Sequence, residues 1–183
     1  MFKNNVNYLV FYIVFCLGMV LVLSGCGGSA IKEANSDPFN FYNQVQLGQP
    51  KSEVDATLSI KPEEKEGTFI YKDDKTGFGV AINYDASNLV SMKTLYHADE
   101  KQIMALSHAK VTEDQLTSIT KGITYEEVKT ILGSDGLEII RLANPVDPNT
   151  PVSTMIWFND DQTGIYVTFS GEKGTVISAK YWK

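Results

Sequence analysis

The fold is read from two stretches that match at a spacing of 74 residues: VQLGQPKSEV at Val45–Val54 and ITKGITYEEV at Ile119–Val128. Each combines a leading apolar residue, a glycine and a closing Glu-Val pair at the same spacing. Further along, Leu89–Lys93 matches Val176–Lys180 at a spacing of 87 residues. Two matched blocks in the same order predict that the chain contains two copies of one unit.

Local signals predict a pair of short helices at the start of each copy. Thr112–Gln115 and Thr124–Glu127 are capping-box patterns, in which a threonine and a Gln or Glu three residues later satisfy the first backbone N–H groups of a helix. Gly48 and Gly122 supply the left-handed turn that ends the first helix of each pair.

Alternating apolar residues follow each helix pair and predict antiparallel strands. Residues 80–84 and 165–169 carry an apolar side chain at every second position. Glycine-containing turns at 73–77, 160–164 and 171–174 separate such runs. Successive hairpins give antiparallel sheets, each with helices on one face.

These elements predict an α+β fold of two tandem helix–helix–antiparallel-sheet repeats. The repeats are expected at 38–98 and 111–183. A connecting helix, with Asp99 as its cap, is expected at 99–110.

The composition excludes several classes of protein. The chain has 183 residues, of which 43% are hydrophobic and 21% are charged, close to the usage of ordinary globular domains. The net charge is −6, and Arg141 is the single arginine among 16 basic residues. A nucleic-acid-binding surface needs a basic stripe, so no nucleic-acid partner is expected. Two cysteines cannot make a disulfide framework.

The N-terminus differs from the rest of the chain. Tyr8–Leu23 is an apolar run of 16 residues, somewhat short for a spanning helix, and Lys3 is the only charge before Cys26. The run ends in Leu23-Ser24-Gly25-Cys26, which resembles the lipobox of bacterial lipoproteins. An uncleaved N-terminal anchor helix is the alternative interpretation.

The lipobox resemblance implies a cellular address. In that family the cysteine thiol receives a diacylglycerol, and the signal peptide is cut directly before the cysteine. Residues 1–25 are then a signal peptide, Cys26 is the lipidated residue, and 26–37 is a small, polar tether. Two acyl chains suffice for stable membrane anchoring. The protein is therefore expected on the extracytoplasmic face of the cell membrane.

The order of helix, glycine and Ile-Thr-x-x-Glu-Val before a sheet resembles the repeat of the β-lactamase inhibitory protein (BLIP) family. It is also similar to the single-copy SmpA/BamE lipoproteins. Ile119–Leu132 is the closer match, whereas the first stretch has Gln49-Pro50 in place of Ile-Thr. In the inhibitor family a concave sheet surface clasps the target enzyme, and an acidic hairpin enters its active site. The resemblance implies this role for the turn that contains Asp73 and Asp74.

No residue pattern indicates a catalytic or metal site. His97 and His108 lack further ligands at the short spacing of a zinc site, so both are interpreted as solvated histidines. The sequence has no G-x-S-x-G, H-E-x-x-H or Walker motif. Asp160-Asp161 lies in a turn where backbone geometry favours aspartate. No cofactor, no metal and no enzymatic activity are expected.

Aromatic residues near the C-terminus are the main candidates for binding. If Ile165 and Val167 face the helices, strand alternation turns Tyr166 outward, and by the same reasoning Lys180 and Trp182. Trp157 is a further candidate for this exposed patch. Exposed aromatic patches usually mark interaction sites. The alternative is that these rings pack against the connecting helix or the other copy.

The sequence therefore predicts a lipid-anchored, extracytoplasmic protein that binds a protein partner through its sheet faces. The candidate binding residues are Trp157, Tyr166, Lys180, Trp182, Asp73 and Asp74. One alternative is an inhibitor of a β-lactamase or another cell-wall hydrolase. Another is an assembly factor of the cell envelope. The sequence does not identify the partner.

Overall fold

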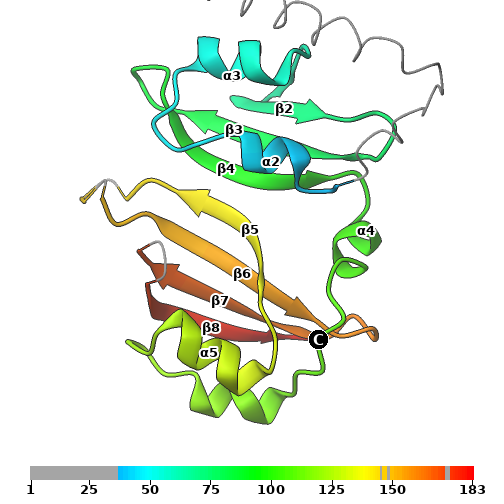
Figure 1. Ribbon diagram of the computed structural model, residues 1–183, viewed down its shortest axis with the longest axis vertical. Helices are drawn as coiled ribbons and strands as arrows, with labels where there is room; N and C mark the ends of the chain where they lie inside the picture. Colours follow the sequence, from blue (N-terminus) through cyan, green and yellow to red (C-terminus); the bar gives the residue numbers. More distant parts are fainter. Residues whose placement is uncertain (1–36, 145, 148, 172–173) are drawn as a thin grey trace, which may run out of the picture. The chain divides into compact units, whose positions relative to one another are not determined.

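The computed structural model describes residues 37–144, 146–147, 149–171 and 174–183 (Figure 1). The expected signal peptide, the lipidation residue Cys26 and all of the tether except Asp37 lie outside the described residues.

The helices are short, with only one or two turns each. Helix α3 ends at Ser59, which takes the left-handed conformation, and α5 ends at Gly133 in the same way. Both expected capping boxes are present, at Thr112 and at Thr124, and Asp99 caps the connecting helix as expected. The helices are α2 (Asn40–Gln44), α3 (Lys51–Leu58), α4 (Glu100–Met104), the 3₁₀ helix η1 (Glu113–Ser118) and α5 (Tyr125–Leu132).

The strands pair in the order in which they occur along the chain, and every pair is antiparallel. They are β1 (Glu63–Lys65), β2 (Thr68–Lys72), β3 (Phe78–Tyr84), β4 (Val90–His97), β5 (Leu137–Leu142), β6 (Val152–Phe158), β7 (Gly164–Ser170) and β8 (Thr175–Trp182).

The expected α+β class, with two separate helix–helix–sheet repeats, is wrong. The described residues form one eight-stranded sheet with five short helices, and helix accounts for only 22%. The two expected sheets are continuous because β4 pairs with β5, which places Met92–Thr94 opposite Ile140–Leu142. An unpaired strand edge readily accepts another strand, and here β5 occupies the edge of β4. The fold is predominantly β.

Helices of both halves cover the same face of this sheet. In β4, the ammonium of Lys93 donates to the carbonyl of Val45, just after α2. Lys93 lies opposite Arg141, and Arg141 lies opposite Ser153. Because Ser153 in turn lies opposite Phe169, Lys93 and Phe169 are on the same face of the sheet. Phe169 packs in one core with residues of α5. Figure 1 shows α2 and α5 on the same side of the strands.

Two hydrophobic clusters make up the core. The first joins α2 and α3 to β2, β3 and β4, and it also contains Ile103 of α4 and Ile156 and Phe158 of β6. The second joins α5 to β6, β7 and β8 around Trp157. Because β6 contributes to both clusters, the two halves of the sheet share buried contacts.

The two stretches that match in sequence make matching hydrogen bonds to the sheet. The N–H of Gly48 donates to the carbonyl of Val90, and the N–H of Gly122 donates to the carbonyl of Val176. The residue after each glycine accepts a hydrogen bond from the same valine. Both glycines have positive φ, as expected, although each lies a few residues beyond the helix rather than at its last turn. We call the two backbone hydrogen bonds between each glycine turn and its valine the clasp.

The clasp corrects the alignment of the second matched block. Val90 corresponds to Val176, a spacing of 86 residues rather than the expected 87. A shift of one residue moves a side chain to the other face of a strand. Lys93 therefore corresponds to Ala179 and not to Lys180, as the sequence match had indicated.

Candidate binding surface

The sheet face opposite α2, α3 and α5, which we call the outer face, carries an uncharged row of side chains. Strand register places one residue from each of seven strands side by side, from β2 to β8. Two isoleucines stand among five small side chains, and the hydroxyls of Thr154 and Thr168 lie 3.2 Å apart. The row is Ile70, Ala81, Thr94, Ile140, Thr154, Thr168 and Ser178.

On the outer face of the sheet, the charged side chains nearest this row lie at its two ends. Glu63 of β1 lies opposite Ile70, and Lys72 follows on the same face of β2. Lys180, at the other end, is exposed on β8. The middle strands thus present a surface without side-chain charges along the row. Depletion of charge at the centre and polar groups at the rim are typical of protein-binding surfaces.

Three aromatic rings form a ladder across β6, β7 and β8 on the outer face. The ring centroids of Phe158 and Tyr166 lie 5.4 Å apart, and those of Tyr166 and Trp182 lie 6.2 Å apart, both edge-to-face. Phe158 is buried, Tyr166 is half-buried, and Trp182 is 43% exposed. Burial, and to a lesser degree the charge of Glu100, raises the pKa of Tyr166. We call these three residues the aromatic ladder.

Backbone pairing positions the exposed end of this ladder. Lys180 lies directly opposite Tyr166, and Trp182 lies directly opposite Gly164. A Cβ at Gly164 would come within 2.5 Å of Phe158 Cδ1, so glycine leaves the space that the ring occupies. The structure thus brings together three of the candidate binding residues from the sequence: Tyr166, Lys180 and Trp182.

Trp157, in contrast, does not belong to this surface. Its side chain is 0% exposed, and its indole N–H donates to the carbonyl of Ser134 at 3.0 Å. The ring fills the space beside Gly136, where a Cβ would lie within 2.5 Å of it. The Met-Ile-Trp-Phe run of β6 is apolar on both faces, because α4 contributes to the cover of Ile156 and Phe158. Alternation alone could not show which face Trp157 takes.

Asp73 and Asp74 lie in the turn between β2 and β3, away from the aromatic ladder in strand order. The carboxylate of Asp73 accepts the N–H of Lys75 at 2.8 Å, which stabilises the turn. Asp74 is exposed, with its carboxylate 3.9 Å from the ammonium of Lys72. The turn therefore exposes Asp74 between Lys72 and Lys75, while the half-buried Asp73 has a structural role.

A buried polar cluster was not predicted from the sequence. The ammonium of Lys93 donates to the carbonyls of Tyr42 and Val45 and lies 4.1 Å from the centroid of the Tyr42 ring. The Tyr42 hydroxyl donates to Glu138, which also pairs with Arg141 at 2.7 Å. We call Tyr42, Lys93, Glu138 and Arg141 the Lys93 cluster. It links α2, β4 and β5.

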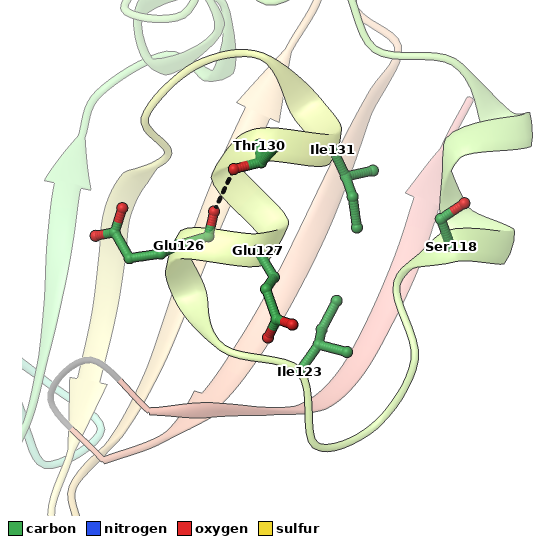
Figure 2. Close-up of a pocket in the computed structure, with 6 residues that line it drawn as sticks. All are labelled: Ser118, Ile123, Glu126, Glu127, Thr130 and Ile131. Atoms are coloured by element: carbon green, nitrogen blue, oxygen red, sulfur yellow. Dashed lines mark hydrogen bonds between the residues drawn. The ribbon is translucent and has the colours of Figure 1, made fainter.

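A groove of about 490 Å³ lies between η1 and α5 (Figure 2). Ile123 and Ile131 line it, and Ser118 faces it from η1. The carboxylate of Glu127 is already bound by the N–H and hydroxyl of Thr124, which hold its pKa below the usual range. The groove offers apolar contact, but its polar groups mostly make hydrogen bonds within α5 and its N-terminal cap.

Candidate ligands for a metal ion do not cluster within the described part of the chain. His108 is exposed and lies 2.8 Å from Asp160, whereas His97 is partly buried. Across the same described residues, no helix has both the length and the apolar character that a membrane span requires.

Comparison with known proteins supplies no family for this chain. No family model matches the sequence, and no curated protein matches it either.

Proposed function

We propose that this chain is a lipid-anchored, extracytoplasmic protein that binds a protein partner through the outer face of its sheet, without catalysis. The observation that carries the proposal is the uncharged row together with the aromatic ladder on the same face, where Tyr166 of the ladder lies two residues from Thr168 of the row. Aromatic anchors next to a surface of low charge are a common arrangement at protein interfaces.

The membrane anchor rests on Leu23-Ser24-Gly25-Cys26 alone. We expect Cys26→Ala to move the protein out of the membrane fraction, or to leave it held by an uncut signal peptide. Mass spectrometry of the wild-type N-terminus checks the same point. A mature N-terminus at any residue other than Cys26 contradicts the anchor.

Photocrosslinking from the outer face tests the binding proposal. A photoreactive amino acid at Thr168 lies in the row, one strand from its β8 end, whereas one at Glu126 lies on exposed α5 and serves as the control. A protein partner should crosslink in intact cells from Thr168 and not from Glu126. Equal crosslinking from both positions would reject the outer face as the binding surface.

Once the partner is identified, Trp182→Ala measures the contribution of the exposed aromatic residue. Truncation of an anchor at an interface commonly costs about 2 kcal/mol, which is roughly a 30-fold loss of affinity. The melting temperature should change little, because Trp182 is 43% exposed at the end of the last strand. Val146→Ala, at a 91% exposed position outside the sheet, is the matched control. Unfolding caused by Trp182→Ala would instead make Trp182 a core residue.

A second candidate function is inhibition of an extracytoplasmic hydrolase. The turn that carries Asp73 and the exposed Asp74 favours it, because such a turn could enter an active-site cleft. The double variant Asp73→Asn, Asp74→Asn distinguishes the two functions. It should abolish inhibition if the turn enters a cleft, and it should leave crosslinking from Thr168 unchanged if the outer face alone binds.

A further inference from the structure

The two edges of the sheet differ in how they meet solvent. β1 is three residues long, and all of them are exposed and charged, which protects that edge against pairing. β8 is eight residues long and carries Ile177, 38% exposed, and Trp182, 43% exposed. Among the described residues these are two of the three exposed large hydrophobic side chains. An exposed apolar edge strand is a site for strand pairing.

The matching edge of β4 shows which kind of segment can pair beside such a clasp. On β4, the clasp holds Val90, and pairing with β5 follows at once through Met92–Thr94. On β8, the same clasp holds Val176. In the part of the chain that the structure describes, no strand pairs with the edge that follows, Ile177–Trp182. The corresponding edge of β4 binds an antiparallel strand, and therefore the edge of β8, which no described strand occupies, has the geometry to bind one.

We propose that this strand is β8 of a second copy of the chain, paired antiparallel about a two-fold axis at Ala179. This inference does not depend on the proposed partner of the outer face. A closed two-fold pair uses the same edge twice and leaves the protected β1 edges outside. Pairing of β8 with β1 of another copy would instead add copies one after another without closing. It would also require the charged β1 edge to accept a strand.

The register follows from three constraints. Residues directly opposite each other in an antiparallel pair must lie on the same face. A two-fold axis between two residues would pair neighbours in sequence, which lie on opposite faces, so the axis must pass through a residue. An axis at Lys180 would place two lysines directly opposite, which is unfavourable. An axis at Ala179 keeps the pairing within 177–181, clear of the clasp at Val176, and sets Lys180 opposite Ser178 of the second copy.

Disulfide formation between full-length chains in detergent tests this register. Opposed Ala179 residues would be about 5.5 Å apart at Cα, within disulfide range, whereas the two Ser178 residues would be about 8 Å apart and out of range. Ala179→Cys should therefore form a disulfide dimer at least roughly tenfold faster than Ser178→Cys. Glu64→Cys on β1 is the control for the other edge, and the wild-type chain gives the background from Cys16 and Cys26.

Two exposed positions repeat the test without a change at Ala179, which is partly buried. Chains with Ser178→Cys, mixed with chains that carry Lys180→Cys, should crosslink to each other faster than either variant crosslinks to itself. The proposal is overturned if the mixture shows no such gain. It is also overturned if Glu64→Cys forms dimers as fast as Ala179→Cys, or if Ala179→Cys crosslinks to a different protein in membranes.

Discussion

At the scale of single residues, Lys93 is the one charged side chain that the described residues bury. Its ammonium is satisfied by the carbonyls of Tyr42 and Val45 and lies near the charges of Glu138 and Arg141. Burial lowers the pKa of Lys93 to about 8, the charge of Glu138 opposes this shift, and Arg141 adds to it. A buried charge of this kind fixes the position of α2 on the sheet at a cost in stability at neutral pH.

The first prediction is that Lys93 makes stability rise with pH. The folded pKa is about 8 and the unfolded value is 10.5, so between these values the unfolded chain binds more protons and stability increases with pH. From pH 7 to 9.5 the wild type should gain about 2 kcal/mol relative to Lys93→Met. Urea unfolding at each pH measures this difference.

The raised pKa of Tyr42 acts in the opposite direction, because its contribution is lost as the pH rises above 10. The comparison is therefore confined to pH 9.5 and below. If the difference between wild type and Lys93→Met is independent of pH, the ammonium is not buried as described.

At the scale of elements, a glycine turn holds each helix pair against the sheet. Gly122 takes a φ of +91° and donates its N–H to Val176, which starts the clasp. Thr124 then begins α5 through a capping box with Glu127. In the first half, Gly48 makes the same bond, but Pro50 stands at the cap without a side-chain hydrogen bond. The glycine turn is thus the feature that both halves share.

The second prediction concerns the conformation of this turn. A Cβ at Gly122 meets nothing within 4 Å, so a substitution there acts through backbone strain alone. Gly122→Val should cost about 1–2 kcal/mol, because a β-branched residue fits the left-handed region poorly. Gly122→Asn should cost less, since asparagine tolerates that region. Thermal unfolding of both variants gives the comparison.

Gly48→Val provides the matched variant in the first half, where the space around the glycine is also empty. It should lose stability to a similar extent. Equal melting temperatures for Gly122→Val and Gly122→Asn would show that positive φ does not matter at this position.

At the scale of the whole molecule, one sheet and a shared strand couple the two halves. β4 pairs with β5, and Ile156 and Phe158 of β6 belong to the same core cluster as Val54 and Leu58 of α3. Both tryptophans, Trp157 and Trp182, lie in the second half. Their fluorescence therefore reports on the second half, whereas circular dichroism reports on all elements.

The third prediction is that a cavity in the first half destabilises both halves together. Leu58, on α3, is 5% exposed, and Leu58→Ala should cost about 3 kcal/mol. Tryptophan fluorescence and circular dichroism should then show the same reduced urea midpoint. Leu132→Ala, at the corresponding buried position of α5, is the control that perturbs the second half directly. A fluorescence midpoint left unchanged by Leu58→Ala would mean that the halves unfold separately.

Local features of this protein could be predicted from the sequence because they depend on neighbouring residues. The capping boxes at Thr112 and Thr124 need only a partner three residues away. Strand alternation likewise placed Tyr166 and Lys180 on the outer face, because Ile165 and Val167 are unambiguously apolar neighbours. As binding residues, they remain a prediction.

Tertiary structure alone decided the features that depend on contacts between distant segments. The single sheet exists because the edge of β4 accepts β5, and no local pattern distinguishes that edge from the free edge of β8. Trp157 lies on the inner face, and the sequence could not show this. Because β6 is covered on both sides, its apolar run has no informative period. The one-residue slip between Val90 and Val176 was likewise visible only in the clasp, since similar residues match at either spacing.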